Sequence, residues 1–472
     1  MTDVSSHALE NWDSMSFREQ EELQDKRVRA MVREVAKYHP AYKQAMREAG
    51  VDPLDVKGVD DFVKKFPFTK KSDVAPTDSH PFRPSYYVMQ RVEDPEYQPV
   101  FMIATTGRTA FSTPFWYTRW DLENVMRPVA RRVGQVTGMN RRDVVINSFP
   151  YSPHLAFWLV YYATTGEGIP AIHTGGGKIL GTQRIVGLTF SVRASVFVGV
   201  PGYMYHVFKT ALGSEKLLED VRLLITGGDR CTPTFRRRIA ELLAEMNAPN
   251  PSICAAYGFT ESRVAPLECP HPDGAYAKDL TGYHTYPDLE FWYCIDPKTG
   301  ERVGSGEKGE LIWTSLGGRG TVVMNYRTGD LAEGGIVYEK CPHCGRNVPR
   351  ISSMISRVSE VKDVRFDKVK GTLVDLNQFF TIMPEHPDVD EWQVVLRRGE
   401  SLVDELVINV SVKKGRRISP EKLAKRLAAY VRERMEISPN EVNVMTPYQI
   451  AQSLGMETQL KEKRIVDLRP RD

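Results

Sequence analysis

The sequence predicts an α/β protein with two units. A large N-terminal unit would combine mostly parallel sheets and helices with a small antiparallel sheet or barrel, and a small C-terminal unit would be α+β. The 472 residues are too many for one compact core. From about residue 143, short apolar runs alternate with helical stretches, which is typical of a parallel sheet covered by helices. After about residue 360, two strands precede an amphipathic helix, which indicates a separate α+β unit.

Helices and buried strands alternate through the first half of the chain. Residues 17–50 are predicted to be helical, because apolar side chains recur at helical spacing from Val28 to Tyr38. A second helix is predicted over 232–246, beginning at Thr232 and Pro233. Three apolar runs are predicted to be buried strands: DVVINSF (143–149), ASVFVGV (194–200) and VRLLITGG (221–228). In parallel sheets the ends of such strands carry the chemistry.

The second half is predicted to be richer in antiparallel strands. Tight turns join three strand-like runs, which indicate an antiparallel sheet or small barrel: 289–303, 306–316 and 334–340. The runs 391–399 and 404–415 are predicted to pair as two strands before a helix that is capped by Ser419. Ile465, Val466 and Leu468 predict that the C-terminal tail docks on the protein.

Composition excludes several classes of function. A net charge of +3 and 41% hydrophobic residues describe an ordinary soluble globular protein. The basic clusters Arg236–Arg238 and Lys413–Arg417 are predicted to be solvated helix faces or turns, so no nucleic-acid partner is expected. The polar N-terminus and the short apolar run at 155–163, against the roughly 20 residues of a membrane span, predict a cytoplasmic protein without membrane contact.

Two motifs carry residues suited to nucleotide chemistry. In AAYGFTES (255–262), the Thr260 hydroxyl could bond phosphate oxygens and the Glu261 carboxylate could hold Mg²⁺. In NYRTGDL (325–331), Asp330 could accept hydrogen bonds from both hydroxyls of a ribose. Each motif alone also fits an ordinary turn, but a pair about 70 residues apart is a stronger signal. A third basic segment is QLKEKRIVDLRP at 459–470.

Together these motifs resemble the adenylate-forming (acyl-/aryl-CoA synthetase) superfamily and, within it, the phenylacetate–CoA ligase family. The resemblance spans nearly the whole chain. It includes KYHPAYKQAMREAGVDP (37–53), FPFTKKSDV (66–74), RLLITGGDRCTPTFRRRI (222–239) and GYHTYPDLEFWYCIDPKTGERV (282–303). LKEKRIVDLR (460–469) is similar to the family's closing segment, although Leu460 replaces its glycine.

The resemblance implies a two-step, ATP-dependent activity. A carboxylate would attack the α-phosphate of ATP to give an acyl-adenylate, and rotation of the C-terminal domain would then let CoA take the acyl group, releasing AMP. An N-terminal adenylation domain (1–357) would hold ATP and the acid, and a mobile C-terminal α+β domain (358–472) would carry the catalytic lysine. Cofactors and co-substrates would be ATP, Mg²⁺ and CoA.

The resemblance also assigns roles to individual residues of this sequence. Lys461 would stabilise the adenylation transition state, Thr260 would touch the ATP phosphates and Glu261 would bind Mg²⁺. Asp330 would bind the ribose, with Arg357 at the hinge. Four further residues would complete the nucleotide site: Tyr257 beside the adenine, Gly258, Gly228 and Asp229.

The stretch TTGRTAFSTP (105–114) is similar in length to the family's phosphate loop but differs in sequence. Ala110, Phe111 and Ser112 replace a glycine, a lysine and a proline, and Arg108 takes a threonine position. Arg108 could supply a replacement cation with a planar fork that suits phosphate. The predicted pyrophosphate contacts are therefore Thr105, Thr106, Gly107, Arg108 and Thr109.

The acyl pocket and a metal site complete the predictions. Six residues are expected to bind the substrate and to favour an aromatic acid: Tyr151, His154, Phe157, Gly175, Gly176 and Tyr203. The aromatic members could equally be core residues. Cys341-Pro-His-Cys344 is a Cys-x₂-Cys knuckle, typical of zinc. The resemblance implies Cys269 and His284 as the remaining ligands of a closed structural Zn²⁺ site; His271 and His343 are competing ligands, and a redox disulfide is the alternative.

Three alternative functions remain open from the sequence. SRVSEV (356–361) replaces the family's Gly-Arg-x-Asp-Asp at the hinge, so the acceptor could be an amine or a carrier protein instead of CoA. The chain could also be a nucleotidyl-transferring relative, which leaves AMP on an acceptor. The altered phosphate loop also fits a relative that binds nucleotide without turnover. A homodimer is compatible with the sequence.

Overall fold

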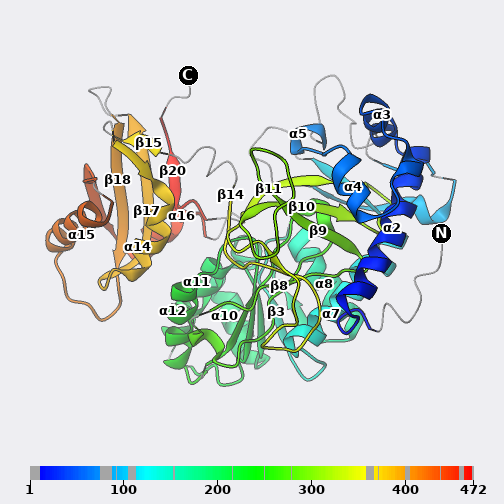
Figure 1. The fold of residues 1–472 in the computed structure, drawn as a ribbon. Coiled ribbons are helices and arrows are strands. Elements are labelled where there is room, and N and C mark those ends of the chain that lie inside the picture. The colour runs from blue at the N-terminus through cyan, green and yellow to red at the C-terminus, as the bar shows by residue number, and fades with distance from the viewer. Residues whose placement is uncertain are drawn as a thin grey trace.

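The structure is a computed structural model, and it describes most of the chain. The described residues are 11–74, 88–91, 93–104, 113–151, 155–214, 216–248, 250–277, 279–357, 366–369, 372–398, 404–435, 437–456 and 462–469. They form a larger N-terminal unit, comprising the described residues up to 357, and a smaller C-terminal unit, comprising those from 366 to 469 (Figure 1).

A five-stranded parallel sheet with the order β4-β3-β5-β6-β7 lies in the N-terminal unit, which confirms the predicted α/β class. Its strands are β3 (Val145–Asn147), β4 (Ala171–His173), β5 (Val196–Gly199), β6 (Leu223–Thr226) and β7 (Ser252–Ala255). The helices of this region are α7 (Arg127–Thr137), α8 (Leu155–Glu167), α9 (Gly177–Leu180), α10 (Thr182–Ser191), α11 (Pro201–Leu212) and α12 (Pro233–Ala244). Thr232 caps α12, as predicted, by accepting a hydrogen bond from the Phe235 N–H.

The N-terminal helices pack on the rest of this unit through their apolar stripe. Helix α2 (Phe17–Tyr38) begins with a capping box between Ser16 and Glu19, and it buries the predicted stripe from Val28 to Val35. The other elements before β3 are α3 (Pro40–Glu48), α4 (Val59–Lys65), α5 (Lys71–Val74), α6 (Arg119–Asp121) and the antiparallel pair β1 (Pro99–Ala104) and β2 (Pro114–Thr118). Short helical turns lie at Pro53–Asp55, Pro95–Tyr97, Leu122–Met126, Thr260–Ser262, Gly274–Tyr276 and Leu376–Gln378.

The predicted antiparallel region forms two separate sheets. One has four strands in the order β14-β11-β10-β9, and the other has three in the order β12-β13-β8. Strand β12 (Ile336–Val337) was expected beside the strands over 289–316, but it pairs with β13 (Arg350–Ile351), which follows the Cys341–Cys344 turn. The remaining bounds are β8 (Tyr283–His284), β9 (Glu290–Ile295), β10 (Gly309–Ser315), β11 (Tyr326–Ala332) and β14 (Ile355–Arg357).

The C-terminal unit is an α+β sandwich with its own buried cluster. Its four-stranded sheet has the order β19-β18-β17-β20, and the tail forms β20, parallel to β17, so the predicted docking of the tail is confirmed. Ser419 caps α15, as predicted, by accepting from the Lys422 N–H at 3.3 Å. The elements are β15 (Phe366–Val369), β16 (Thr372–Asp375), α14 (Phe379–Glu385), β17 (Val389–Arg398), β18 (Asp404–Val412), α15 (Pro420–Met435), β19 (Glu441–Met445), α16 (Pro447–Leu454) and β20 (Ile465–Asp467).

One sequence expectation about charge is wrong. Arg236 and Arg238 were expected in solvent, but both are buried in α12. Arg236 pairs with Glu268 at 2.7 Å, and Arg238 pairs with Asp390 of the C-terminal unit at 2.9 Å. Carboxylates from distant segments make this burial tolerable. None of the described helices has the length and the apolar character needed to cross a membrane.

Candidate functional site

The two nucleotide motifs meet around Asp330. The Tyr257 hydroxyl donates to Asp330 Oδ2 at 2.7 Å, and Arg357 Nη1 lies 2.9 Å from Asp330 Oδ1. Strand pairing places Asp330 opposite Arg357 in the register of β11 and β14. The structure therefore brings together three of the residues predicted to hold the nucleoside.

Backbone irregularities position the Asp330 carboxylate. Gly329 has φ +71°, in the left-handed region that glycine adopts at little cost, and the register between β10 and β11 shifts between Glu310 and Ile312. Such a bulge changes the direction in which the following side chain points. Burial, together with the neighbouring Asp330 charge, raises the pKa of Tyr257, so its hydroxyl stays protonated as a donor.

Thr260 and Glu261 form a short helical turn after Tyr257. The Tyr117 hydroxyl donates to the Thr260 carbonyl at 2.7 Å, and the Tyr326 hydroxyl donates to Glu261 Oε1 at 2.8 Å. Glu261 is 6% exposed, and burial raises the pKa of its carboxyl group. A cation beside this buried carboxylate would favour its charged form. Sequence reasoning missed Tyr326, although it lies inside the NYRTGDL heptapeptide.

Some of the other predicted residues lie in the described part of the chain, and the rest lie outside it. Gly228 and Asp229 lie in the loop after β6, and Asp229 acts electrostatically on Arg464 of the C-terminal unit. Gly258 packs against Val264 and Ala265. Several predicted residues lie outside the described part of the chain: Thr105, Thr106, Gly107, Arg108, Thr109, His154 and Lys461.

Predicted acyl-pocket residues gather beyond the carboxyl ends of β3 and β4. The ring centroids of Tyr151 and Phe157 are 5.3 Å apart, in an edge-to-face arrangement. The Tyr151 N–H donates to the Gly175 carbonyl at 3.1 Å, which joins the aromatic pair to the glycine loop that includes Gly176. Phe157 is buried, whereas Tyr151 is 57% exposed, so Tyr151 is the member of this pair that is accessible to a ligand.

Tyr203 approaches the same glycine loop from helix α11. Its ring lies so close to Gly177 that a Cβ there would stand 2.7 Å from the Tyr203 hydroxyl oxygen. The Tyr203 and Thr182 hydroxyls are 3.2 Å apart. His173 was missed by sequence reasoning; its ring lies 5.9 Å from that of Phe157.

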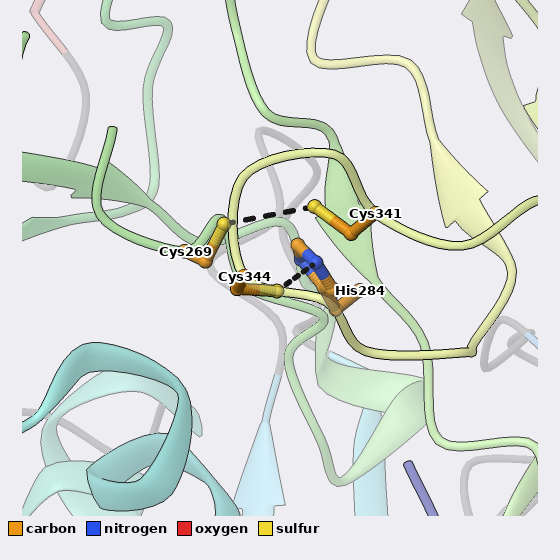
Figure 2. A group of neighbouring side chains, drawn as sticks. All are labelled: Cys269, His284, Cys341 and Cys344. Atoms are coloured by element: carbon orange, nitrogen blue, oxygen red, sulfur yellow. Dashed lines mark hydrogen bonds between the residues drawn. The ribbon is translucent and has the colours of Figure 1, made fainter. Parts of the chain in front are cut away.

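The four predicted zinc ligands converge, as Figure 2 shows. Cys269 Sγ lies 3.9 Å from Cys341 Sγ, and Cys344 Sγ lies 3.3 Å from His284 Nε2. Their ligand atoms all lie within 4.8 Å of one another. The His284 Nδ1 lies 3.0 Å from the Leu267 carbonyl oxygen, so donation there leaves Nε2 for the cluster.

The competing histidines lie outside this cluster. His271 Nε2 is 3.2 Å from Asp279 Oδ1, and His343 Nε2 is 3.6 Å from Asp279 Oδ2. All six cysteines of the chain are free thiols in the structure. Three thiols and one imidazole supply four protein donors and leave no open position, which suits a structural tetrahedral ion.

Comparisons with known proteins agree with this architecture. Residues 117–324 match the family model described as AMP-binding enzyme. The chain is 26% identical to the phenylacetate–coenzyme A ligase of Thermus thermophilus over 466 residues, which cover 95% of this chain and 96% of that enzyme. It is 25% identical to the phenylacetate–coenzyme A ligase of Aromatoleum evansii, with 98% of each chain covered.

Solved structures of one ligase share the fold over nearly the full length. A 2-hydroxyisobutyryl-CoA ligase in its postadenylation state, with 2-HIB-AMP bound, has a TM-score of 0.79 at 19% identity, covering 99% of this chain and 94% of that chain. The same ligase with 2-HIB-AMP and CoA in its thioesterification state has a TM-score of 0.65 at 19% identity, covering 98% of this chain and 92% of that chain.

Proposed function

The chain belongs to the phenylacetate–CoA ligase family of adenylate-forming enzymes, and from this premise we propose that it is an acid–CoA ligase acting on an aromatic carboxylic acid. In the first step a carboxylate oxygen attacks the α-phosphorus of ATP, and pyrophosphate leaves. In the second step the CoA thiol, losing its proton, attacks the carbonyl carbon of the acyl-adenylate, and AMP leaves. The product is an acyl-CoA thioester.

The contact between the motif that contains Tyr257 and the motif that contains Asp330 is the main support for the proposal. Tyr257 donates to Asp330, although 73 positions separate them, and Arg357 pairs with the other carboxylate oxygen. In the proposed complex the Asp330 carboxylate accepts from the ribose hydroxyls, and Tyr257 lies beside the adenine. Charge-assisted hydrogen bonds of this kind are about twice as strong as neutral ones.

Glu261 and the thiol cluster are the proposed metal ligands. The Glu261 carboxylate would hold Mg²⁺, which would neutralise charge on the ATP phosphates. Cys269, Cys341, Cys344 and His284 would hold a structural Zn²⁺, and the hydrogen bond from His284 to Leu267 fits this role. The boundary between an adenylation domain (1–357) and a mobile domain (358–472) is part of the same proposal.

The aromatic acid is proposed from the ring pair at the acyl pocket. The rings of Tyr151 and Phe157 lie edge to face, and the Tyr203 ring lies against Gly177 of the glycine loop. An aromatic ring in this position would gain edge-to-face contacts in addition to apolar burial. CoA is the proposed acceptor, with an amine or a carrier protein as the alternatives.

One assay across a panel of acids tests the function. The enzyme with MgATP should exchange labelled pyrophosphate into ATP only when its acid is present, and aromatic acids should give the highest rates. AMP release should then require CoA. If AMP is released with an amine or a carrier protein and not with CoA, that compound is the acceptor. If AMP itself is transferred to the acceptor, the activity is nucleotidyl transfer and the proposal is wrong. Binding of ATP without exchange on any acid would indicate a non-catalytic relative.

Arg108 is expected to replace the missing cation of the phosphate loop. Arg108→Ala should raise the KM for MgATP by about tenfold or more, as expected for one charge-assisted contact. Phe111→Lys should change this KM little, because Arg108 would already supply the cation that binds pyrophosphate. The two variants are compared by steady-state kinetics at saturating acid and CoA. An unchanged KM in Arg108→Ala would refute the replacement.

A further inference from the structure

A buried ion cluster joins the two units of the structure at Asp390. Helices α11 and α12 of the N-terminal unit lie beside the C-terminal unit in Figure 1. The Tyr205 hydroxyl donates to Asp390 Oδ1 at 2.8 Å, and Arg238 Nη2 lies 2.9 Å from the same oxygen. Lys209 pairs with Oδ2, and Arg238 also donates to the Asp390 backbone carbonyl. Asp390 is 2% exposed, so three side chains of one unit enclose a carboxylate of the other.

A second carboxylate crosses the interface at the start of α11. Val200, the residue before the helix, provides no side-chain cap. The Glu462 carboxylate occupies the space where a Cβ on Gly202 would stand, in the first turn of α11. A negative charge is favourable at this end of a helix. Arg464 ties Glu462 to Glu391 of β17, with Arg464 Nη2 2.8 Å from Glu391 Oε2.

These contacts fix the segment next to Lys461. Glu462 directly follows Lys461 in the sequence, and Gly202 directly precedes Tyr203 of the proposed acyl pocket. Burial lowers the pKa of Arg464, but the charges of Glu391, Glu462 and Asp229 of the proposed nucleotide site raise it above its ordinary value. The observed orientation thus places Glu462, which directly follows the proposed catalytic lysine in the sequence, beside the site where acid and ATP would meet.

We infer that Asp390 and Glu462 are positioning residues, which hold the C-terminal unit in the orientation needed for acyl-adenylate formation. The inference rests on the proposed function. In the second step the C-terminal domain would rotate, and the contacts of Asp390 with α11 and α12 would then be broken. Burying an ion pair adds little net stability, because desolvation offsets the attraction, but removing one partner leaves a costly unpaired charge. The cluster therefore favours one orientation of the two units.

Two variants disturb the interface from opposite sides. Asp390→Asn removes the charge that Arg238 and Lys209 share, and Gly202→Ala places a methyl group where the Glu462 carboxylate lies. Asp388→Asn is a matched control, because Asp388 is also buried but pairs with Arg426 inside its own unit, at 2.9 Å. Gly187→Ala in α10 is the second control, because a Cβ there would meet nothing within 4 Å.

The half-reactions are measured separately. Asp390→Asn and Gly202→Ala should slow acid-dependent ATP–pyrophosphate exchange by about tenfold or more. Transfer from a preformed acyl-adenylate to CoA should stay within about twofold of the wild type. Both controls should leave both rates unchanged, and Asp390→Glu should recover part of the exchange. Equal losses in both half-reactions, or no loss in either, would overturn the inference.

Hydrogen–deuterium exchange separates this inference from the proposed function. Without any substrate, the first turn of α11 should exchange faster in Asp390→Asn and Gly202→Ala than in the wild type and the two controls, because Glu462 would no longer cover it. If the wild type shows no pyrophosphate exchange with any of the acids, the proposed function fails. The hydrogen–deuterium exchange of α11 still tests the interface in that case. Unchanged protection in both variants would show that Asp390 and Glu462 do not hold the units together.

Discussion

Replacing Lys461 with alanine is expected to slow acyl-adenylate formation by about 10²-fold or more, the loss typical when one preorganised donor is removed from a transition state. The lysine would act as a point charge on the phosphoryl oxygens, where negative charge is spread during the displacement. Acid-dependent ATP–pyrophosphate exchange measures this step. Transfer from a preformed acyl-adenylate to CoA should persist, because that step no longer involves the pyrophosphate leaving group.

Lys463 provides the matched control for this variant. It lies two positions after Lys461, and its side chain is exposed. Lys463→Ala should therefore leave both half-reactions near the wild-type rates. If Lys461→Ala lowers both half-reactions equally, Lys461 serves a general structural or binding role and its assignment to adenylation is wrong.

Loss of the proposed zinc ion is expected to destabilise the N-terminal unit. Protein purified without added metal should contain about one zinc per chain by elemental analysis, since the cluster has a single set of four donors. Apparent binding free energies at structural zinc sites are on the order of 10 kcal/mol. Cys341→Ser should therefore remove the zinc and lower Tm by roughly 5 °C or more, measured by calorimetry.

A buried cysteine outside the cluster controls for the loss of a buried thiol. Cys254 lies in β7 and is fully buried, and the zinc content of Cys254→Ala should match that of the wild type. A cavity at this position lowers Tm without releasing metal. If the wild type contains no zinc and all its thiols titrate freely, the cluster is not a metal site, although the thiols lie together.

Local sequence determined the elements and the chemistry that they carry. Helical spacing from Val28 to Val35 fixed the buried face of α2, and unbroken apolar runs predicted β3, β5 and β6 because strands covered on both faces expose no polar side. The motifs that contain Tyr257 and Asp330 could also be paired from the sequence, because their chemistry is complementary. Cys341 and Cys344 form a knuckle by their spacing alone.

Only the tertiary structure decided which partner each buried polar group meets. Arg238 looked like part of a solvated basic cluster, yet it is buried against Asp390, which lies 152 positions away. Tyr326 lies near Asp330 in the sequence, but its hydroxyl donates to Glu261. The periodicity of apolar residues indicates which side chains face a core, because the direction of each side chain depends on the local backbone geometry. The identity of a charge's partner depends on how distant segments pack, so the buried contacts of Asp390 and Glu462 appear only in the folded chain.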